Sequence, residues 1–468
     1  MLDKILVLDM DTSGSIAIAR RLRSSNIYCK ILRGDASAND VMQEDPSGII
    51  WVGDDKSLTS IDPAILKLGL PMLALSGAAR ALAVHLGAAC ESMLLTKAAE
   101  TVTYDEAVLF EDVTDGERWF PSACKTHLPE RLVSIARVNG SSVGFADNEN
   151  KLYGLQFTIE RNDPDGVIIL TNFCRKICGC TAWWSAEAFV ERTVTEIARI
   201  AEDRKVVCAL SGGVDSSVCA MLGAKAVGER LIPVYIDSGL AKVNNDRQIE
   251  QFCKNTLKLE LVRIDAKDTF LANLEGVLDK DEKFEIVSDT IREVLANSLG
   301  GETQNAFLLL GTNYSELLTD DACDSLSRNV PPFQSLIEPL IELFKDEVRD
   351  VGELLGLPHS LVHAQSFPTT GFAGRICGAA DARTLELLRK ADAIFSEEIE
   401  RAGQERKLSQ YYVSLEGCGG DTAVLRALTS GDNSQAARLP FDLIGRVAER
   451  IAEETPELKH VYYDFTAR

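Results

Sequence analysis

The sequence predicts an α/β protein made of two doubly wound α/β domains and a small α+β domain at the C-terminal end. In the first third of the chain, short apolar runs alternate with helical stretches, and the same alternation begins again near residue 205. Strands that alternate with helices form parallel sheets covered by helices. From about Phe367 the pattern changes to helices and one last strand-like run, which predicts the smaller domain.

The first domain is predicted to cover residues 1–185. Its apolar runs are typical of strands, and the segments between them have the apolar spacing of helices. A more irregular, β-rich stretch follows to about residue 160. A long helix is expected after Ser185, which precedes Glu187 in the order typical of a helix cap. The predicted strands are 5–10, 48–53 and 71–77, and the predicted helices are 16–25 and 78–88.

The second domain is predicted to cover residues 186–366, and the third to cover residues 367–468. The second opens with a buried strand, VVCAL, that runs into a glycine turn and a helix rich in Ala, Val and Leu. The third ends in HVYYDFTAR, which is typical of an edge strand. Further strands of the second domain are expected at 231–237, 259–265 and 307–312.

Composition and charge are those of an ordinary globular protein: 468 residues, 46% of them hydrophobic and 26% charged. No apolar run approaches the roughly 20 residues needed to cross a bilayer, and the N-terminal segment is too short and acidic for a signal peptide. The net charge of −22 disfavours binding to nucleic acid or to anionic membranes. We therefore expect a cytoplasmic protein without nucleic-acid or membrane partners.

The twelve cysteines are scattered, which is typical of reduced cytosolic thiols rather than of a disulfide framework. One cluster, Cys174, Cys178 and Cys180, invites comparison with a metal site. It lacks a second Cys-x-x-Cys pair or a paired histidine, and the chain has only five histidines. Buried or linker thiols are therefore favoured over a zinc site.

The strongest chemical signal is the string SGGVDSS at 211–217, between a predicted strand and a predicted helix. Two glycines let the backbone approach an anion, and free N–H groups at the start of a helix point toward it. The loop has no lysine, which disfavours a Walker A site, and GxGxxG is absent. A turn that merely joins strand to helix is the competing interpretation. The candidate phosphate-binding residues are Ser211, Gly212, Gly213, Val214, Asp215, Ser216 and Ser217.

In this strand–loop–helix setting, SGGVDSS resembles the pyrophosphate loop of N-type ATP pyrophosphatases, which grips the β- and γ-phosphates while AMP is transferred to a substrate oxygen. Around it the chain resembles the GMP synthase family over nearly its whole length. The blocks that carry this resemblance are NFCRKICGC (172–180), YIDSGL (235–240), LFKDEVRDVGELLGLP (343–358), RKADAIFSEEI (389–399), and ALTSGD with ARLPFDLI (427–444).

The resemblance implies a class I glutamine amidotransferase domain of flavodoxin-like fold, an ATP pyrophosphatase domain of the adenine nucleotide alpha hydrolase-like fold, and a C-terminal domain that forms a homodimer. In the family, ammonia from glutamine reaches the second domain. There the 2-oxygen of xanthosine monophosphate (XMP) is adenylated, and ammonia displaces AMP to give GMP. ATP and Mg²⁺ are the implied cofactors, because the departing pyrophosphate concentrates negative charge.

Matching the family's motifs also implies roles outside the loop. Asp237 ends a strand at the crevice where such sheets bind ligands. Lys345 would counter the pyrophosphate charge, with Asp346 near the metal, although a solvated helix face is the competing interpretation for both. The implied catalytic residues are Asp215, Lys345 and Asp346, the implied ATP-binding residues are the loop with Asp237, Gly311 and Thr312, and the implied Mg²⁺ ligand is Asp215.

The first domain departs from the family at its catalytic residues. Class I amidotransferases carry G-I-C-x-G-x-Q at a strand–helix elbow, and Q-F-H-P-E later. Here Ser76 stands in place of the cysteine and Thr158 in place of the histidine, and only Glu160 is kept. A serine without an adjacent imidazole is barely nucleophilic, and losing such a unit lowers the rate on the order of 10⁴–10⁶-fold. We therefore predict an inactive glutaminase, kept for packing or for docking a partner.

The acceptor site departs as well. The family's P-F-P-G-P-G-L-A-x-R segment reads SFPTTGFAGR at 366–375, in which Gly371 and Arg375 remain as candidate acceptor-binding residues. The family's lid segment is changed at 325–332, and its tail, with a lysine that faces the nucleotide, has no counterpart after 463–468. Such a lysine typically contributes ~1.5–3 kcal/mol per charged hydrogen bond. These changes weaken the expectation that XMP is the acceptor.

Three functions stay open from the sequence. The chain is an ammonia-dependent GMP synthase, an adenylating enzyme of the same mechanism that acts on another carbonyl or carboxyl compound, or a pseudoenzyme that binds ATP and regulates a partner. The intact phosphate loop argues against the third, the changed lid and tail favour the second, and the overall likeness favours the first.

Overall fold

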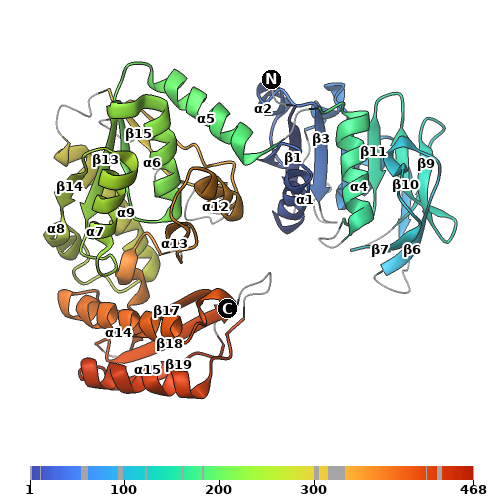
Figure 1. Ribbon diagram of the computed structural model, residues 1–468. Coiled ribbons are helices and arrows are strands. Elements are labelled where there is room, and N and C mark those ends of the chain that lie inside the picture. Colours follow the sequence, from blue (N-terminus) through green and yellow to red (C-terminus); the bar gives the residue numbers. More distant parts are fainter. Residues whose placement is uncertain are drawn as a thin grey trace. The chain divides into compact units, whose positions relative to one another are not determined.

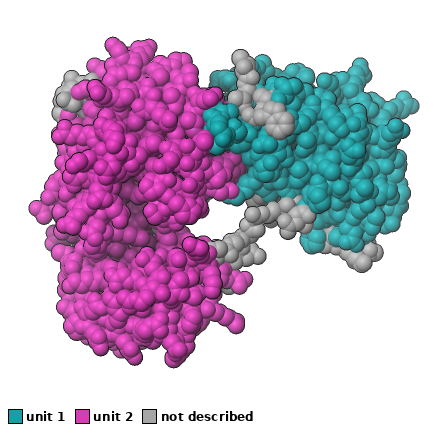
Figure 2. All heavy atoms as spheres, viewed as in Figure 1, with its two compact units in different colours: residues 1–188 teal, residues 189–468 magenta. Residues whose placement is uncertain are grey.

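Figure 1 shows the chain as a computed structural model. The structure describes residues 3–10, 12–53, 62–92, 99–121, 124–159, 163–181, 184–299, 305–314, 333–365, 367–417, 419–429 and 435–466. They form two compact units, residues 1–188 and 189–468, which Figure 2 colours separately. Parallel strands dominate the largest sheet of the second unit and form half of that of the first, so the predicted α/β class is confirmed. The finer division at residues 185 and 366 stays a prediction.

The first unit is built on a nine-stranded sheet. Its parallel half has the order β2-β1-β3-β4-β11, which is the flavodoxin-like order of a doubly wound sheet. Its other half is antiparallel and corresponds to the β-rich stretch expected before residue 160. The strands are β1 (Ile5–Met10), β2 (Cys29–Arg33), β3 (Gly48–Gly53), β4 (Met72–Ser76), β6 (Ala99–Tyr104), β7 (Gly116–Trp119), β9 (Val133–Val138), β10 (Ser141–Asp147) and β11 (Leu152–Leu155).

Helices pack on this sheet. Leu8 and Trp51 of the strands share a hydrophobic core with Leu82 of α3, whereas α1 contacts β1 and α4. The helix predicted after Ser185 is present, and the Ser185 hydroxyl accepts a hydrogen bond from the N–H of Ala188 at 3.2 Å. The helices of this unit are α1 (Thr12–Ser24), α2 (Ala38–Gln43), α3 (Gly77–His85) and α4 (Pro164–Asn172), and a small ribbon pairs β5 (Ala89–Ser92) with β8 (Cys124–His127). Helix α5 (Ala186–Ala201) begins at the end of the first unit and belongs mostly to the second.

The second unit contains a five-stranded, fully parallel sheet of order β14-β13-β12-β15-β16. Helices cover both faces: Leu295 of α9 packs with Leu308, whereas Gly223 of α6 lies against Leu309, whose side chain points to the other face. The strands are β12 (Val206–Ala209), β13 (Leu231–Asp237), β14 (Val262–Asp265), β15 (Phe307–Leu309) and β16 (Ser335–Ile337). The helices are α6 (Val214–Val227), α7 (Asn245–Phe252), α8 (Lys267–Asn273), α9 (Lys280–Ser298), α12 (Lys345–Leu354) and α13 (His359–Val362).

The C-terminal part of the second unit is an α+β layer, as predicted. Its three-stranded sheet pairs β17 antiparallel and β19 parallel to the central β18, so the run predicted as an edge strand is one. Helix α14 packs on β17 and on α15. The hydrophobic core of this C-terminal part includes Phe395 of α14 and Leu425 of β18. It continues without a break to α9 and to Phe270 of α8. The elements are α14 (Ala382–Arg401), β17 (Leu408–Glu416), β18 (Thr422–Thr429), α15 (Phe441–Glu454) and β19 (His460–Tyr463).

Within the described ranges of the chain, no helix combines the length and the apolar character that crossing a bilayer requires.

Candidate active site

The string SGGVDSS, called the phosphate loop, lies at the carboxyl edge of the parallel sheet: Ser211, Gly212 and Gly213 follow β12, and the remaining residues form the first turn of α6. Strand β12 lies between β13 and β15, where the strand order reverses, and doubly wound sheets bind ligands in the crevice at this point. Gly213 is the N-cap of α6 and offers no side chain to the helix. The first N–H groups of α6 therefore lack partners within the helix and lie at the positive end of its dipole. This arrangement suits a phosphate group.

Serine hydroxyls hold the loop in its shape. Ser216 Oγ donates to the Gly213 carbonyl at 3.1 Å and accepts from the Ser211 N–H at 3.2 Å. Ser217 Oγ donates to the same carbonyl at 2.9 Å. The predicted serines therefore lie together, and part of their hydrogen-bonding capacity fixes the backbone of the loop.

Gly212 is required by the geometry of the turn. Its φ is +86°, and a Cβ atom there would lie 2.3 Å from Oδ1 of Asn245. The Asn245 amide donates to the Ser211 carbonyl at 3.1 Å. Asn245 was missed by sequence reasoning, because an asparagine at the start of a helix 34 residues away carries no motif.

Asp215, in the first turn of α6, is the centre of a polar cluster. It forms an ion pair with Lys345, the first residue of α12, and accepts a hydrogen bond from the amide of the buried Asn313 at 3.3 Å. A Cβ atom on Gly311 would lie 2.8–3.0 Å from the backbone of Asp215 and Ser216. The chain that follows β15 therefore packs directly on the loop, and four of the predicted residues meet there: Asp215, Ser216, Gly311 and Lys345.

Two further residues predicted to bind ATP or to act in catalysis, Thr312 and Asp346, are neighbours of this cluster in the sequence. Thr312 is half-buried between Gly311 and Asn313, and Asp346 is exposed on α12 next to Lys345. Asn313 had no assigned role in the sequence, although it directly follows the predicted Gly-Thr pair. The binding and catalytic roles of these residues stay predictions.

Asp237 ends β13 beside the loop and is held by two cations. Arg263 donates to its carboxylate at 2.6 Å and Lys267 lies 3.0 Å from the same oxygen, while the Gly239 N–H donates at 3.3 Å. Burial alone would raise the pKa of Asp237, but the hydrogen bonds from Arg263 and Lys267 outweigh it and hold the pKa below its usual value. Asp237 is therefore a charged carboxylate that anchors the two cations at the crevice.

A small pocket opens beside the loop. Its lining is largely apolar and carries no charged side chain, so it suits an uncharged part of a ligand better than a phosphate group. The lining residues are Leu210, Gly212, Ser217, Gln248, Ile249, Phe252 and Leu361.

The segment that matches the acceptor motif begins with a turn packed on the backbone after β13. Gly371 has a φ of +58°, and a Cβ atom there would lie 2.4 Å from the carbonyl oxygen of Leu240. The Phe372 N–H donates to the same carbonyl at 2.9 Å. Glycine is therefore required at this position by close backbone approach. Ser366, which begins the motif, lies outside the described residues.

Arg375, in contrast, is buried among protein groups. Its guanidinium donates to Asp392 at 3.2 Å and lies 4.8 Å and 4.7 Å from the ring centroids of Phe367 and Tyr412. Burial raises the pKa of Asp392 and lowers that of Arg375, and each charge opposes the shift of the other. In this arrangement Arg375 fastens the segment to α14.

Lys283 of α9, also missed from the sequence, lies fully buried beneath the same segment. Its ammonium donates to the carbonyls of Ile376 at 2.7 Å and Gly378 at 2.5 Å, and burial lowers its pKa. No sequence signal could identify it, because its partners are backbone carbonyls more than 90 residues away.

In the first unit, Ser76 occupies a strand–helix elbow between β4 and α3. Its φ of +56° and ψ of −127° are uncommon for a residue other than glycine. A strained turn of this kind aims a nucleophile outward in hydrolases. The backbone of the elbow is therefore present, with a hydroxyl where a thiol is expected.

Thr158 follows β11, the parallel neighbour of β4, so the chain leaves the sheet there at the same edge as Ser76. The N–H and the hydroxyl of Thr158 both donate to the carbonyl of Trp119, at 2.9 Å and 3.3 Å. Topology thus places the two residues at neighbouring strand ends. Glu160 lies outside the described residues.

Neither histidine of the first unit is placed to assist Ser76. His85 is the last residue of α3, nine residues beyond the elbow and about 13 Å away at the helical rise. His127 pairs in β8 with Ala89 of β5, which follows the end of α3, and lies 3.4 Å from Glu91. Both histidines lie at the far end of α3.

Of the three clustered cysteines, Cys174 lies in a π-helical turn, Phe173–Ile177, and Cys178 and Cys180 follow it; all are free thiols. Cys174 and Cys180 are buried. Burial raises the pKa of Cys180 to about 11 and raises the pKa values of Cys174 and Cys178 still further. Their environment is that of unreactive buried thiols.

Comparison with known proteins gives a family model that matches part of the chain and relatives that match its whole length. A sequence model of the NAD synthase family matches residues 183–411. The glutamine-hydrolysing GMP synthase of Clostridium acetobutylicum is 36% identical over 505 aligned positions, which cover 100% of this chain and 98% of that protein. The same enzyme of Acetivibrio thermocellus is 35% identical over 498 positions, covering 99% and 98%.

A solved structure is similar to part of the chain. It is a glutamine amidotransferase from Thermotoga maritima. Its sequence identity is 14% and its TM-score is 0.31, over 38% of this chain and 99% of that chain.

Proposed function

This chain belongs to the GMP synthase family, and we propose that it is a ligase that uses ATP to activate an oxygen atom of its substrate. AMP is transferred to that oxygen, pyrophosphate leaves, and ammonia then displaces AMP to form a carbon–nitrogen bond. In this proposal XMP is the acceptor, GMP is the product, and free ammonia is the nitrogen source. We place the reaction in the cytoplasm, where the free cysteines stay reduced.

The phosphate loop is the observation that carries the proposal. The backbone turn at Gly212 and the uncapped start of α6 lie at the crevice of the sheet, with the chain after β15 packed on them. The loop offers N–H groups to the β- and γ-phosphates, which become the leaving group. It carries no lysine, and Lys345 from α12 would supply the positive charge instead.

The residues near the loop fit the Mg²⁺ ion that accompanies ATP. The carboxylate of Asp215 lies beside the loop and accepts a hydrogen bond from the side-chain nitrogen of Asn313, and carboxylate oxygens are ligands that Mg²⁺ accepts. When bound there, Mg²⁺ would offset part of the charge of the pyrophosphate. Lys345 would then turn its ammonium from Asp215 toward the phosphate oxygens.

We further propose that the first unit does not hydrolyse glutamine. Ser76 keeps the elbow geometry, but Thr158 cannot accept its proton, and both histidines of the unit lie at the far end of α3. Without a base, a serine hydroxyl stays protonated and is a weak nucleophile at neutral pH. The enzyme therefore depends on free ammonia from solution.

A second candidate is the same chemistry on another carbonyl or carboxyl acceptor. The observation that favours it is the placement of Arg375, whose guanidinium is paired with Asp392 and stacked on aromatic rings instead of pointing to solvent. An arginine held in this way is a poor partner for a nucleotide phosphate.

The test is pyrophosphate release by the purified full chain with ATP, Mg²⁺ and ammonium, with and without XMP. We expect XMP to stimulate release and GMP to form, and glutamine in place of ammonium to give neither GMP nor glutamate. Release that requires a different carbonyl compound would favour the second candidate. No release with a broad panel of acceptors would contradict both and indicate a pseudoenzyme.

A further inference from the structure

We propose that Glu353, His359 and His363 form a binding site for a divalent transition-metal ion of the zinc type. In the part of the chain that the structure describes, they are the one group of three metal-ligating side chains whose ligand atoms come together, all within 4.8 Å of one another. The three side chains are exposed on α12 and at the two ends of the α13 turn, and none of them belongs to the phosphate loop.

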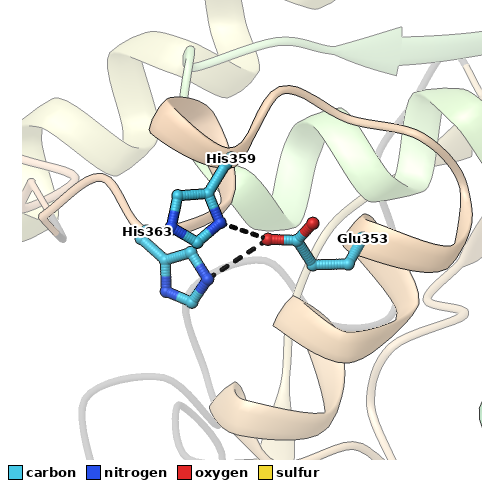
Figure 3. Close-up of side chains that lie close together, drawn as sticks. All are labelled: Glu353, His359 and His363. Atoms are coloured by element: carbon cyan, nitrogen blue, oxygen red, sulfur yellow. Dashed lines mark hydrogen bonds and ion pairs between the residues drawn. The ribbon is translucent and has the colours of Figure 1, made fainter.

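The distances suit a single ion. Nδ1 of His359 lies 2.7 Å from Oε1 of Glu353, and Nε2 of His363 lies 3.3 Å from the same oxygen. Figure 3 shows both rings turned toward this carboxylate, which comes from a neighbouring helix. A tetrahedral Zn²⁺ ion with bonds of about 2.0–2.1 Å holds its ligand atoms about 3.3 Å apart. Small side-chain rotations would therefore let the ion replace the two hydrogen bonds.

The backbone holds the three residues in place before any ion binds. His359 and His363 are four residues apart, and the N–H of His363 donates to the carbonyl of His359 at 3.0 Å, so both side chains lie on one face of a helical turn. Gly356, with a φ of +82°, reverses the chain between α12 and α13. The two helical segments are therefore joined by a short, hydrogen-bonded turn.

Close packing fixes the two helices against each other. A Cβ atom on Gly352 would lie 3.3 Å from Val362 and 3.4 Å from Leu357, and Val362 is fully buried. Ligand positions on packed helices are more precise than on free loops. The site therefore needs little ordering when an ion binds.

The ligand set selects the class of ion. Two imidazoles and one carboxylate suit Zn²⁺, Ni²⁺, Co²⁺ or Cu²⁺, whereas Mg²⁺ prefers oxygen ligands alone. All three side chains are exposed, so water or a further ligand can complete the coordination.

An ion bound here would stabilise α12. Lys345, which pairs with the phosphate loop, is the first residue of this helix, and Glu353 is the ninth. The ion would tie the far end of this helix to α13, from which the chain continues to the Gly371 turn. A structural role is therefore the one that the location favours.

The experiment is a Co²⁺ and Zn²⁺ titration of the full chain after chelator treatment, followed by calorimetry and by the visible spectrum of Co²⁺. We expect one equivalent to bind, with a spectrum that lacks a thiolate charge-transfer band. His363→Ala and Glu353→Gln should each weaken binding by about tenfold or more. The matched control is His460→Ala, an exposed histidine on β19, which should bind as the unaltered chain does.

Circular dichroism and the Tm of the metal-free variants check folding, and Zn²⁺ should raise Tm in the unaltered chain and in His460→Ala but not in His363→Ala. Equal affinity in all four proteins would overturn the proposal. So would a thiolate band, because it would place the ion on cysteines.

Discussion

The ion pair between Lys345 and Asp215 connects α12 to the phosphate loop. It places a positive charge beside the loop although the chain as a whole is acidic. The net charge of −22 repels phosphate at long range, but contacts within a few ångströms are screened much less where they are partly buried. Lys345 is paired with the loop carboxylate, and its side chain is only a quarter exposed. Its positive charge is therefore available where a leaving pyrophosphate would form.

Replacing Lys345 with methionine tests this role. The change removes a charged hydrogen-bond donor worth about 1.5–3 kcal/mol, so pyrophosphate release should fall roughly 10- to 150-fold. Lys345→Arg should recover part of the loss because it keeps the charge. The control is Lys254→Met, at an exposed site outside the cluster, which should keep full activity. Equal rates for Lys345→Met and the unaltered chain would show that this lysine has no part in turnover.

At the residue scale, the motif predicted part of the site. The string at 211–217 located the loop, and the Gly-Thr pair after β15 was matched from the family and lies against it. Asn245, Arg263 and Lys283 could not be predicted, because each acts through a partner distant in sequence and none belongs to a motif. Arg375 matched a family position, yet the structure buries it against Asp392.

At the scale of elements, the site depends on how closely β15 and α6 approach. The backbone after β15 touches the first turn of α6 at Gly311, and no side chain fits between them. The contact aligns the helix start with the crevice of the sheet. It also holds Asn313 beside Asp215.

Gly311→Ala should therefore separate the two elements. Its Cβ atom would lie 2.8–3.0 Å from backbone atoms that cannot turn away, so the loop must move. We expect ATP affinity to fall by at least about tenfold and stability by roughly 1–3 kcal/mol. Gly445→Ala is the matched control, because a Cβ atom there meets open space on α15. It should leave ATP binding unchanged and gain up to about 1 kcal/mol in helix stability. Unchanged ATP binding in Gly311→Ala would contradict the close-contact account.

Helices α14 and α15 are joined by a buried glutamate with three arginine partners. Glu398 is 1% exposed, and Arg450 and Arg446 lie 2.9 Å and 3.4 Å from its carboxylate, with Arg401 also in contact. Burial alone would raise the pKa of Glu398, but Arg450, Arg401 and Arg446 outweigh it and lower the pKa. Folding therefore favours the charged form of this carboxylate.

The stability contributed by Glu398 should depend on pH. A lowered pKa in the folded state gives stability that is complete above the ordinary value of 4.5 and is lost as pH falls through the folded pKa. Glu398→Gln should destabilise the chain by roughly 1–2 kcal/mol at pH 7, measured by urea unfolding, and the difference should shrink below about pH 4.5.

The matched control is Glu397→Gln, at a largely exposed glutamate that pairs with the same Arg450. Such surface pairs contribute little, so its effect should stay below about 0.5 kcal/mol. A Glu398→Gln effect that is constant from pH 7 to pH 4 would contradict the assigned cause.

At the scale of the whole molecule, the α/β class could be predicted because alternating strands and helices leave a strong period in the sequence. The two sheets have the doubly wound orders that this alternation implies. The prediction that only helices precede the last strand was wrong at the long strands β17 and β18, whose apolar residues are also compatible with buried helices. The short helix α2 and strand β2 were missed for lack of length.

We predict that the C-terminal part forms a homodimer. It exposes large apolar side chains that a monomer would leave in water: Phe441 is 85% exposed, Phe465 65% and Tyr462 57%. Sedimentation should give twice the chain mass of 51.1 kDa. Phe441→Glu combined with Phe465→Glu should shift the protein toward monomer. Leu278→Glu, at a site 63% exposed outside this part, should not. A monomer at all concentrations would contradict the prediction.

The most direct test of the whole account is calorimetric binding of ATP with Mg²⁺ and of AMP to the full chain and to Gly212→Ala. If the loop grips the β- and γ-phosphates, ATP should bind roughly 100-fold more tightly than AMP, because at least two charged hydrogen bonds separate them. Gly212→Ala strains a φ of +86° and meets Asn245, so it should remove that preference and leave AMP binding unchanged. An equal preference for ATP in both proteins, or no ATP binding at all, would contradict the account.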